Sequence, residues 1–231
     1  MVPSFYREWR HVFKLDPDRA IADEALAAVC RSGTDAILVG GSTGITYDNT
    51  AELLARVRRY ALPCAVEVSD SAAGVPGFDG YFIPMVLNSR RREWLIGHHA
   101  AALKEFGHLL PWEAVVGEAY LVLNPDSAVA RLTEADAALE EEDAIAYSQV
   151  ADRLWQAPVL YVEYSGSFGS MPLVRRIKGG LRQAHLFYGG GIDGPNKARE
   201  AAGAAHTVVV GNVIYENLDA ALATVHAVKD Q

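Results

Sequence analysis

The sequence has few cysteines, no long apolar run and no excess of positive charge. Its 231 residues include only two cysteines, Cys30 and Cys64, which lie in apolar segments without a CxxC spacing. Disulfides and cysteine metal sites are therefore not expected, and the pattern is typical of a protein in the reducing cytoplasm. Residues 1–10 lack the apolar core of a signal peptide, and no apolar run approaches the ~20 residues of a membrane span.

The net charge of the chain bears on which class of molecule it binds. The chain carries 21 basic and 29 acidic residues, a formal net charge of −8, and half of its residues are hydrophobic. This acidity argues against nucleic acid as the main partner. The length and composition fit a soluble α/β protein with one large core.

Short apolar runs alternate with helical patterns along the whole chain. The runs predict strands at 11–15, 35–41, 64–69, 80–87, 115–123, 159–165, 185–188 and 207–210. The segments between them predict helices at 18–31, 49–60, 91–106, 143–155, 171–179, 195–204 and 214–228. This alternation favours a (β/α)8 TIM barrel that forms a single domain over 1–231. Residues 70–79 (DSAAGVPGFD) are too short and too rich in glycine for a helix. We therefore expect the third helix to be replaced by an extended segment.

Glycines follow the last two predicted strands. A GGGI segment, 189–192, follows the seventh strand, and Gly211 and Asn212 follow the eighth. Barrel active sites form at the carboxyl ends of the strands, and the loops after strands seven and eight often bind phosphate. Glycine lets backbone N–H groups approach phosphate oxygens closely. The pairing of the two loops favours a phosphate site over simple tight turns, and no GxGxxG dinucleotide motif follows the first strand.

Polar residues at the end of the first strand indicate a second element of the site. Lys14 and Asp16 alternate, so both side chains can face the barrel mouth. A buried lysine needs a partner, which a phosphate or Asp16 would supply. Asp16, helped by the Ser42 hydroxyl, could hold Mg²⁺, which prefers carboxylate oxygens together with substrate phosphates. From residue types alone, a Lys14–carboxylate ion pair without a metal is equally acceptable.

One carboxylate stands in an otherwise apolar and aromatic strand. Glu163 lies in VLYVEYSG, where it is either paired for structure or poised as a general base. Tyr161 and Tyr164 could offer hydroxyls to a polar ligand, or could simply form the barrel wall. In the next helical region, Ala100, Ala101 and Ala102 either permit close helix packing or line an apolar tunnel.

Six segments together resemble the geranylgeranylglyceryl phosphate synthase family, and within it the bacterial PcrB-type branch of heptaprenylglyceryl phosphate synthases. They are WRHVFKLDPD (9–18), SGTDAILVGGSTGIT (32–46), VPGFDGYFIPMVLNS (75–89), LYVEYSGSFG (160–169), LFYGGGI (186–192) and VVVGNVIYENLDAAL (208–222). The resemblance covers nearly the whole chain in order. The family fold, a barrel whose third helix is an extended segment, agrees with the short 70–79 link.

The resemblance implies a Mg²⁺-dependent prenyl transfer. In that reaction the 3-hydroxyl of sn-glycerol 1-phosphate attacks C1 of a long all-trans polyprenyl diphosphate and releases diphosphate, which begins an ether lipid. Glu163 would take the hydroxyl proton, Asp16 and Ser42 would bind Mg²⁺, and Ala102 would leave the prenyl tunnel open to a chain such as heptaprenyl. The residues that would bind glycerol phosphate are Lys14, Tyr161, Val162, Glu163, Tyr164, Ser165, Gly166, Gly191, Gly211 and Asn212.

Further expectations concern partners and competing functions. The resemblance implies a homodimer, and a lipid substrate makes transient contact with a membrane surface conceivable without a transmembrane segment. No DDxxD aspartate pair occurs, so the chain-elongating prenyltransferases match poorly. The phosphate loops fit a barrel isomerase or aldolase acting on a small sugar phosphate equally well. A phosphoprotein-binding barrel without enzymatic activity is a third, more distant interpretation.

Overall fold

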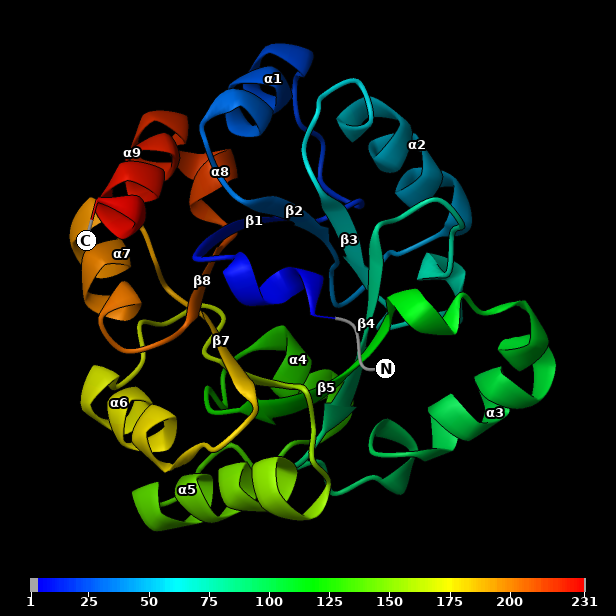
Figure 1. Cartoon of the computed structure of the whole chain (residues 1–231), viewed down its shortest axis with the longest axis vertical. Coiled ribbons are helices and arrows are strands. Elements are labelled where there is room, and N and C mark those ends of the chain that lie inside the picture. Colours follow the sequence, from blue (N-terminus) through cyan, green and yellow to red (C-terminus); the bar gives the residue numbers. More distant parts are fainter. Residues whose placement is uncertain (1–3, 231) are drawn as a thin grey trace.

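The computed structural model describes residues 4–230 and has the predicted parallel barrel. Eight strands follow one another in chain order and the last pairs with the first, so the sheet is closed (Figure 1). Each strand overlaps its predicted run, with ends that differ by no more than two residues. The strands are β1 (His11–Leu15), β2 (Ala36–Val39), β3 (Cys64–Glu67), β4 (Gly80–Val86), β5 (Val115–Val122), β6 (Val159–Glu163), β7 (His185–Gly189) and β8 (Thr207–Val210).

Helices surround the sheet, as Figure 1 shows. They are α1 (Asp23–Arg31), α2 (Tyr47–Val57), α3 (Gly97–Phe106), α4 (Ala128–Thr133), α5 (Glu141–Gln149), α6 (Met171–Gly180), α7 (Pro195–Ala202), α8 (Val213–Glu216) and α9 (Leu218–Lys229). The prediction for the β3–β4 link is confirmed, because a 3₁₀ turn over Ser71–Ala73 stands where a helix would be. Three helix bounds differ from the prediction, since α1 begins at Asp23 rather than at 18, α3 begins at Gly97 rather than at 91, and α5 ends at Gln149, where a π-helical turn follows, rather than at 155. Two further features were not predicted. Ser127 caps the unpredicted α4, and Asn217 separates α8 from α9 by capping the latter.

Strand alternation divides the core into two layers. Residues such as Phe13, Ile37 and Leu160 point outward and pack against the helices. Their neighbours point into the barrel, where Phe82 and Phe187 belong to a second cluster. The barrel interior is therefore filled with side chains, as in other barrels of this size.

A short 3₁₀ turn, Phe5–Glu8, closes one end of the barrel. Tyr6 is fully buried, and its ring makes edge contacts with Phe82 and Phe187 at centroid distances of 5.8 and 6.2 Å. Its hydroxyl donates to the carbonyl of Pro158, just before β6, at 3.4 Å. Figure 1 shows this blue turn across the barrel opening. The amino-terminal end of the barrel is thus plugged, and the opposite end remains for a site.

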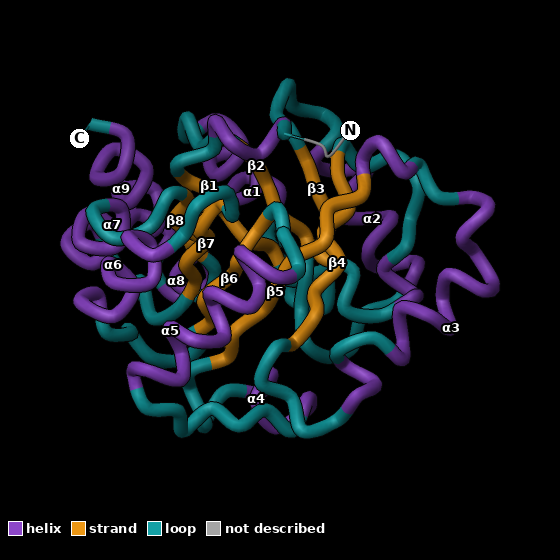
Figure 2. The backbone as a smooth tube through the Cα atoms, turned by 60° about the horizontal axis from the view of Figure 1, so that its bottom comes forward, coloured by secondary structure: helices purple, strands orange, loops and turns teal. Residues whose placement is uncertain are grey.

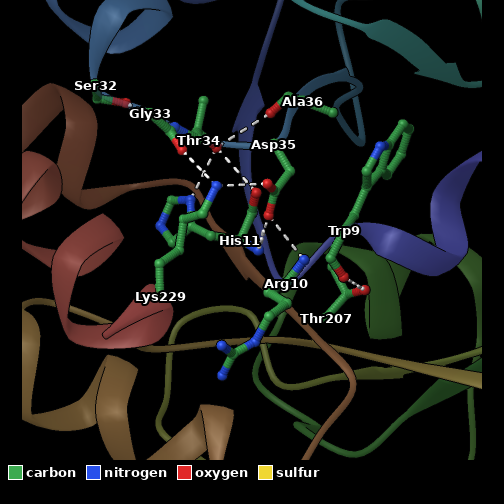
Figure 3. A network of polar contacts seen from close by, with 10 residues as sticks. All are labelled: Trp9, Arg10, His11, Ser32, Gly33, Thr34, Asp35, Ala36, Thr207 and Lys229. Carbon is green, nitrogen blue, oxygen red and sulfur yellow. Dashed lines mark hydrogen bonds and ion pairs between the residues drawn. The ribbon is translucent and has the colours of Figure 1, made fainter. Parts of the chain in front are cut away.

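A network of polar contacts joins β1, β2 and α9 at the plugged end (Figure 3). Asp35 accepts hydrogen bonds from the backbone N–H groups of Arg10 and His11 at 2.8 and 3.0 Å. Its other oxygen lies 2.6 Å from Lys229 Nζ. The His11 ring contacts the Thr34 hydroxyl at 2.9 Å. The polar side chains of this network are therefore paired within the protein.

Within residues 4–230, no helix combines the length and apolar character that crossing a bilayer requires.

Candidate active site

Lys14 is the central positive charge inside the barrel. It points inward from β1, and its Nζ lies 2.7 Å from Glu67 Oε1 on β3. The same ammonium lies 5.5 Å from the ring centroid of Tyr161. Burial alone would lower the pKa of Lys14, but the carboxylates of Glu67, Glu163 and Glu118 outweigh it and raise that pKa. The lysine is therefore charged, and its partner in the protein is Glu67 rather than Asp16.

Glu163 lies at the carboxyl end of β6 with both oxygens engaged. Tyr120 Oη donates to Oε2 at 2.6 Å, and the Ser165 backbone N–H donates to Oε1. Glu163 is buried, which raises its pKa, while Lys14 and these donors oppose the rise. Tyr120 stacks on Tyr161 with centroids 4.6 Å apart. A carboxylate with a raised pKa, held by donors beside an open strand end, is suited to general-base chemistry.

The other members of the predicted 161–166 stretch face different directions. Val162 packs in the outer core, so its side chain does not reach the barrel mouth. The carbonyl of Ser165 accepts a hydrogen bond of 2.6 Å from Asn124 Nδ2. Gly166 has a φ of +88°, which lets the loop turn away from the strand. Tyr161 and Glu163 are thus the inward-facing members of this stretch.

Close packing against β6 and the β6–α6 loop requires glycine at the last residue of β7, Gly189, and in the loop that follows. The Tyr164 N–H donates to the Gly189 carbonyl at 2.7 Å. A side chain at Gly189 would collide with the Tyr161 hydroxyl, and one at Gly191 would collide with the backbone between Ser167 and Phe168. Gly191 also has a φ of +57°. Close packing therefore accounts for glycine at each of these positions, and the binding of phosphate by this loop stays a prediction.

The loop after β8 lies beside β1. A Cβ at Gly211 would stand 3.7 Å from the Lys14 carbonyl. Asn212 Oδ1 accepts a hydrogen bond of 3.0 Å from Arg19. Because β7, β8 and β1 are neighbours in the barrel, both glycine loops and Lys14 lie in the same sector of the mouth. The residues assigned to the phosphate are therefore brought together.

Asp16 and Ser42 lie at the adjoining ends of β1 and β2. A Cβ at Gly41 would come within 2.6–2.8 Å of the Asp16 carboxylate, so this carboxylate rests on the backbone beside Ser42. Asp16 Oδ1 accepts from the Asp18 N–H at 2.9 Å. Burial and the Asp18 charge raise the pKa of Asp16. Across residues 4–230, no three His, Cys, Asp or Glu side chains gather as metal ligands.

Ala102 lies on α3, apart from the polar residues. It is half-buried, whereas Ala100 and Ala101 are exposed, and α3 contains no fully buried residue. His99 Nε2 lies 2.9 Å from the Pro84 carbonyl and attaches this helix to β4. Figure 2 shows α3 at the outer edge of the molecule. Ala102 therefore lies on the less exposed side of a helix that His99 attaches to β4, and its place in a prenyl tunnel stays a prediction.

Two residues inside the barrel were not predicted from the sequence. Glu118 and Tyr120 both lie within β5, whose pattern otherwise predicts buried core. Glu118 is fully buried, and Tyr120 bonds to Glu163. Both residues are an even number of positions from Val116 and Val122, whose side chains face into the barrel. Because side chains alternate along a strand, this spacing could have predicted that Glu118 and Tyr120 also face inward.

Comparisons with known proteins agree with this arrangement. The sequence profile of the PcrB family matches residues 5–229. Heptaprenylglyceryl phosphate synthase of Bacillus cytotoxicus is 55% identical over 224 residues, covering 97% of this chain and 98% of that protein. The enzyme of the same name from Bacillus cereus is 53% identical, covering 96% and 97%. The (S)-3-O-geranylgeranylglyceryl phosphate synthase of Thermoplasma acidophilum, solved with sn-glycerol-1-phosphate, has a TM-score of 0.86 at 26% identity, with both chains fully covered.

Proposed function

Because the chain belongs to the PcrB family, we propose that it is a heptaprenylglyceryl phosphate synthase. This prenyltransferase joins the 3-hydroxyl of sn-glycerol 1-phosphate to C1 of heptaprenyl diphosphate. The observation that carries the proposal is the convergence of Lys14, Glu163 and both glycine loops at the open end of the barrel. An isomerase or aldolase would share the phosphate loops, but the relatives that are 53–55% identical over nearly the whole chain are heptaprenylglyceryl phosphate synthases.

Glycerol phosphate is assigned to the sector where β6, β7, β8 and β1 end. The Lys14 ammonium and the backbone N–H groups around Gly191 and Gly211 would hold the phosphate. The 3-hydroxyl would then face Glu163. A new C–O bond forms at C1 of the prenyl chain as the C1–O bond to diphosphate breaks, and the hydroxyl proton passes to a Glu163 oxygen. Holding both substrates in line supplies much of the rate enhancement.

Asp16 and Ser42 are proposed to hold Mg²⁺ beside this sector. The donor set fits, since Mg²⁺ is usually held by one or two carboxylates together with substrate phosphates. The Asp16 carboxylate rests on the Gly41 backbone next to Ser42, and its Oδ2 accepts no hydrogen bond from the described residues. Bound Mg²⁺ would offset the negative charge that grows on the leaving diphosphate.

We also propose that the protein binds transiently to a membrane surface, forms a homodimer and is located in the cytoplasm. Large apolar side chains are exposed on and around α3, where the long prenyl chain is assigned: Ile96, Leu103, Phe106, Leu109 and Trp112. An apolar surface of this kind supports transient binding to a lipid surface. The two buried, unpaired cysteines support a reducing compartment. Co-sedimentation with lipid vesicles measures the membrane contact. Light scattering measures the molar mass and so tests the homodimer.

One assay tests the activity and the chain length together. The protein is incubated with labelled sn-glycerol 1-phosphate, Mg²⁺ and prenyl diphosphates of increasing length, and the lipid is extracted. We expect labelled lipid, formed best with heptaprenyl diphosphate. Absence of labelled lipid at every length would refute the transferase assignment.

Ala102→Trp in the same assay tests the tunnel. Each buried CH₂ contributes about 0.8 kcal/mol, so a long tail binds well only if its path is open. The variant should keep activity with short prenyl diphosphates and lose activity with heptaprenyl diphosphate. Ala101→Trp, on the exposed side of the same helix, is the matched control and should leave chain length unaffected. Equal loss with both lengths in Ala102→Trp would mean that Ala102 only packs the helix.

A further inference from the structure

Two buried carboxylates inside the barrel have oxygens without partners. Both oxygens of Glu118 and Oε2 of Glu67 accept no hydrogen bond from any described residue. Glu118 is fully buried, and Glu67 is nearly so. An ionised carboxylate without donors is costly in such surroundings. A proton held between the Glu67 and Glu118 carboxyl groups would remove this cost.

The strand register places Glu118 beside Glu67. Lys14 is in register with Ala65 through β2, yet it contacts Glu67, two residues further along β3. This offset is the stagger of a tilted barrel, in which each interior layer comes from alternate strands. Glu67 is in register with Val116 through β4. The same two-residue offset from Val116 leads to Glu118, so β1, β3 and β5 contribute Lys14, Glu67 and Glu118 to one layer.

The charges of this layer do not balance if every carboxylate is ionised. Lys14 faces three glutamates: Glu67, Glu118 and Glu163. Lys14 forms an ion pair with Glu67, and Glu163 has its own donors. Burial, then Glu67 and Glu163, raise the pKa of Glu118 well above its ordinary value, and Lys14 only partly opposes them. The surroundings of Glu118, with no donor to either oxygen, therefore favour its protonated form.

We propose that Glu118 is a positioning residue: as a neutral acid it donates a hydrogen bond to Glu67 Oε2 and so fixes the Glu67–Lys14 ion pair. Glu67 remains ionised, with Oε1 on Lys14 and Oε2 on Glu118. The Lys14 ammonium is thereby held toward the sector assigned to the phosphate. The inference rests on the proposed function only in assigning Lys14 to glycerol phosphate.

The protonation of Glu118 is measured first, in the unliganded protein. Carbon-13 NMR of the glutamate carboxyl carbons is recorded against pH, and Glu118→Gln assigns the signal. We expect the Glu118 carboxyl to remain protonated through neutral pH. A Glu118 signal that titrates like that of an exposed glutamate overturns the proposal. This measurement needs no substrate, so it decides the point even if the prenyl transfer fails.

Binding of sn-glycerol 1-phosphate by calorimetry tests the positioning. Glu118→Met removes the donor at similar volume, and we expect about tenfold weaker binding, because Glu67 loses a hydrogen bond to its charged form. Glu118→Gln retains an N–H donor and should bind clearly better than Glu118→Met. Equal weakening in both variants would overturn the proposal, since it would mean that the carboxyl group acts in another way.

A double-mutant cycle separates coupling from general packing. In a Glu67→Gln background, exchange of Glu118 for Met should have at most a small further effect on binding, because the bond in question is already altered. Additive effects would show that Glu118 acts independently of Glu67 and overturn the proposal. Circular dichroism monitors the fold of each variant. If Glu118→Met does not fold, the NMR titration and the Gln variant still decide the question.

Discussion

Carboxylates at the two ends of this barrel have opposite pKa shifts. At the amino-terminal end, Asp35, Asp79 and Asp152 accept hydrogen bonds from backbone N–H groups at or next to strand starts. These donors, with nearby lysine or arginine, hold the pKa of each aspartate below its usual range despite burial. Toward the carboxyl end, burial dominates and raises the pKa of Glu118 and Glu163.

The opposite pKa shifts indicate that carboxylates at the amino-terminal end stabilise the fold, whereas those toward the carboxyl end are suited to a functional role. Carboxylates that are fully supplied with donors stabilise the ionised form, and therefore the fold, at neutral pH. A buried carboxylate with a raised pKa is destabilising in its ionised form, either because it lacks donors, as Glu118 does, or because burial outweighs its donors, as at Glu163. Strongly perturbed carboxylates of this kind are candidates for functional groups. Barrels commonly divide their ends in this way, with catalysis at the carboxyl end of the strands.

Removing the basicity of Glu163 should have the largest effect on turnover. Glu163→Gln keeps the shape and the contact with Tyr120 but cannot accept the hydroxyl proton. We expect kcat to fall by about 10²–10⁴-fold, with glycerol phosphate binding only modestly weaker. Steady-state kinetics measure both. Lost binding with a normal kcat would instead make Glu163 a clamp for the hydroxyl.

Asp16→Asn tests the proposed metal site at the same end. The substitution keeps the side-chain size but removes the charge that would hold Mg²⁺. We expect turnover to fall by about 10²-fold, since a metal ion contributes several kcal/mol to stabilising the transition state. Activity is titrated against Mg²⁺, and circular dichroism checks the fold. Near-normal turnover at low Mg²⁺ would contradict the metal assignment.

Gly191→Ala tests the packing of the loop that is proposed to bind phosphate. The new Cβ would collide with the loop backbone near Ser167, and the φ of +57° disfavours it further. We expect the KM for glycerol phosphate to rise by about tenfold, an energetic cost of the size seen for such backbone strain. The KM for prenyl diphosphate should change little.

Gly194→Ala is the matched control for this loop. A Cβ at Gly194 would meet nothing within 4 Å, and the residue precedes α7 in extended geometry. The control should leave both KM values unchanged. If Gly191→Ala weakened both substrates equally, the loop would support the fold rather than one substrate.

The smallest effect on catalysis is expected at the plugged end, where His11 governs a pH-dependent part of the stability. Burial lowers the pKa of His11 to about 3, below its unfolded value of about 6.5. The neutral ring thus stabilises the fold fully above pH 6.5, and this contribution is lost as the pH falls from 6.5 toward 3. The loss amounts to about 1.4 kcal/mol of unfolding free energy per pH unit.

His11→Asn removes this titration while keeping a group near the Thr34 hydroxyl. Urea unfolding between pH 7 and pH 4 should show a shallower pH dependence in the variant, and kcat at pH 7 should stay near that of the wild type. His185, whose pKa burial also lowers to about 3, should account for part of the remaining dependence. An unchanged pH dependence would mean that His11 is not the titrating group.

Much of this molecule follows from local pattern and chain order. The spacing of apolar residues was enough to predict the eight strands, the missing third helix and the polar residues at the strand ends. The order of the strands then follows from chain order, because consecutive βαβ units are right-handed. Lys14, Asp16, Glu163 and the glycines were identifiable because they interrupt apolar strands or end them. The two glycine loops could be located at the carboxyl end because their position in the barrel follows from strand number, and their binding of phosphate stays a prediction.

Only the tertiary structure decided which groups meet inside the barrel. Lys14 and Glu67 are 53 residues apart, and the tilt and stagger of the strands select Glu67, not Asp16, as the lysine's partner. The same stagger places Glu118 in their layer, although in sequence it is one charged residue in a core strand. Local pattern determines which side of a strand faces inward, whereas barrel register determines which inward residues share a level, because register is set by all eight strands closing together.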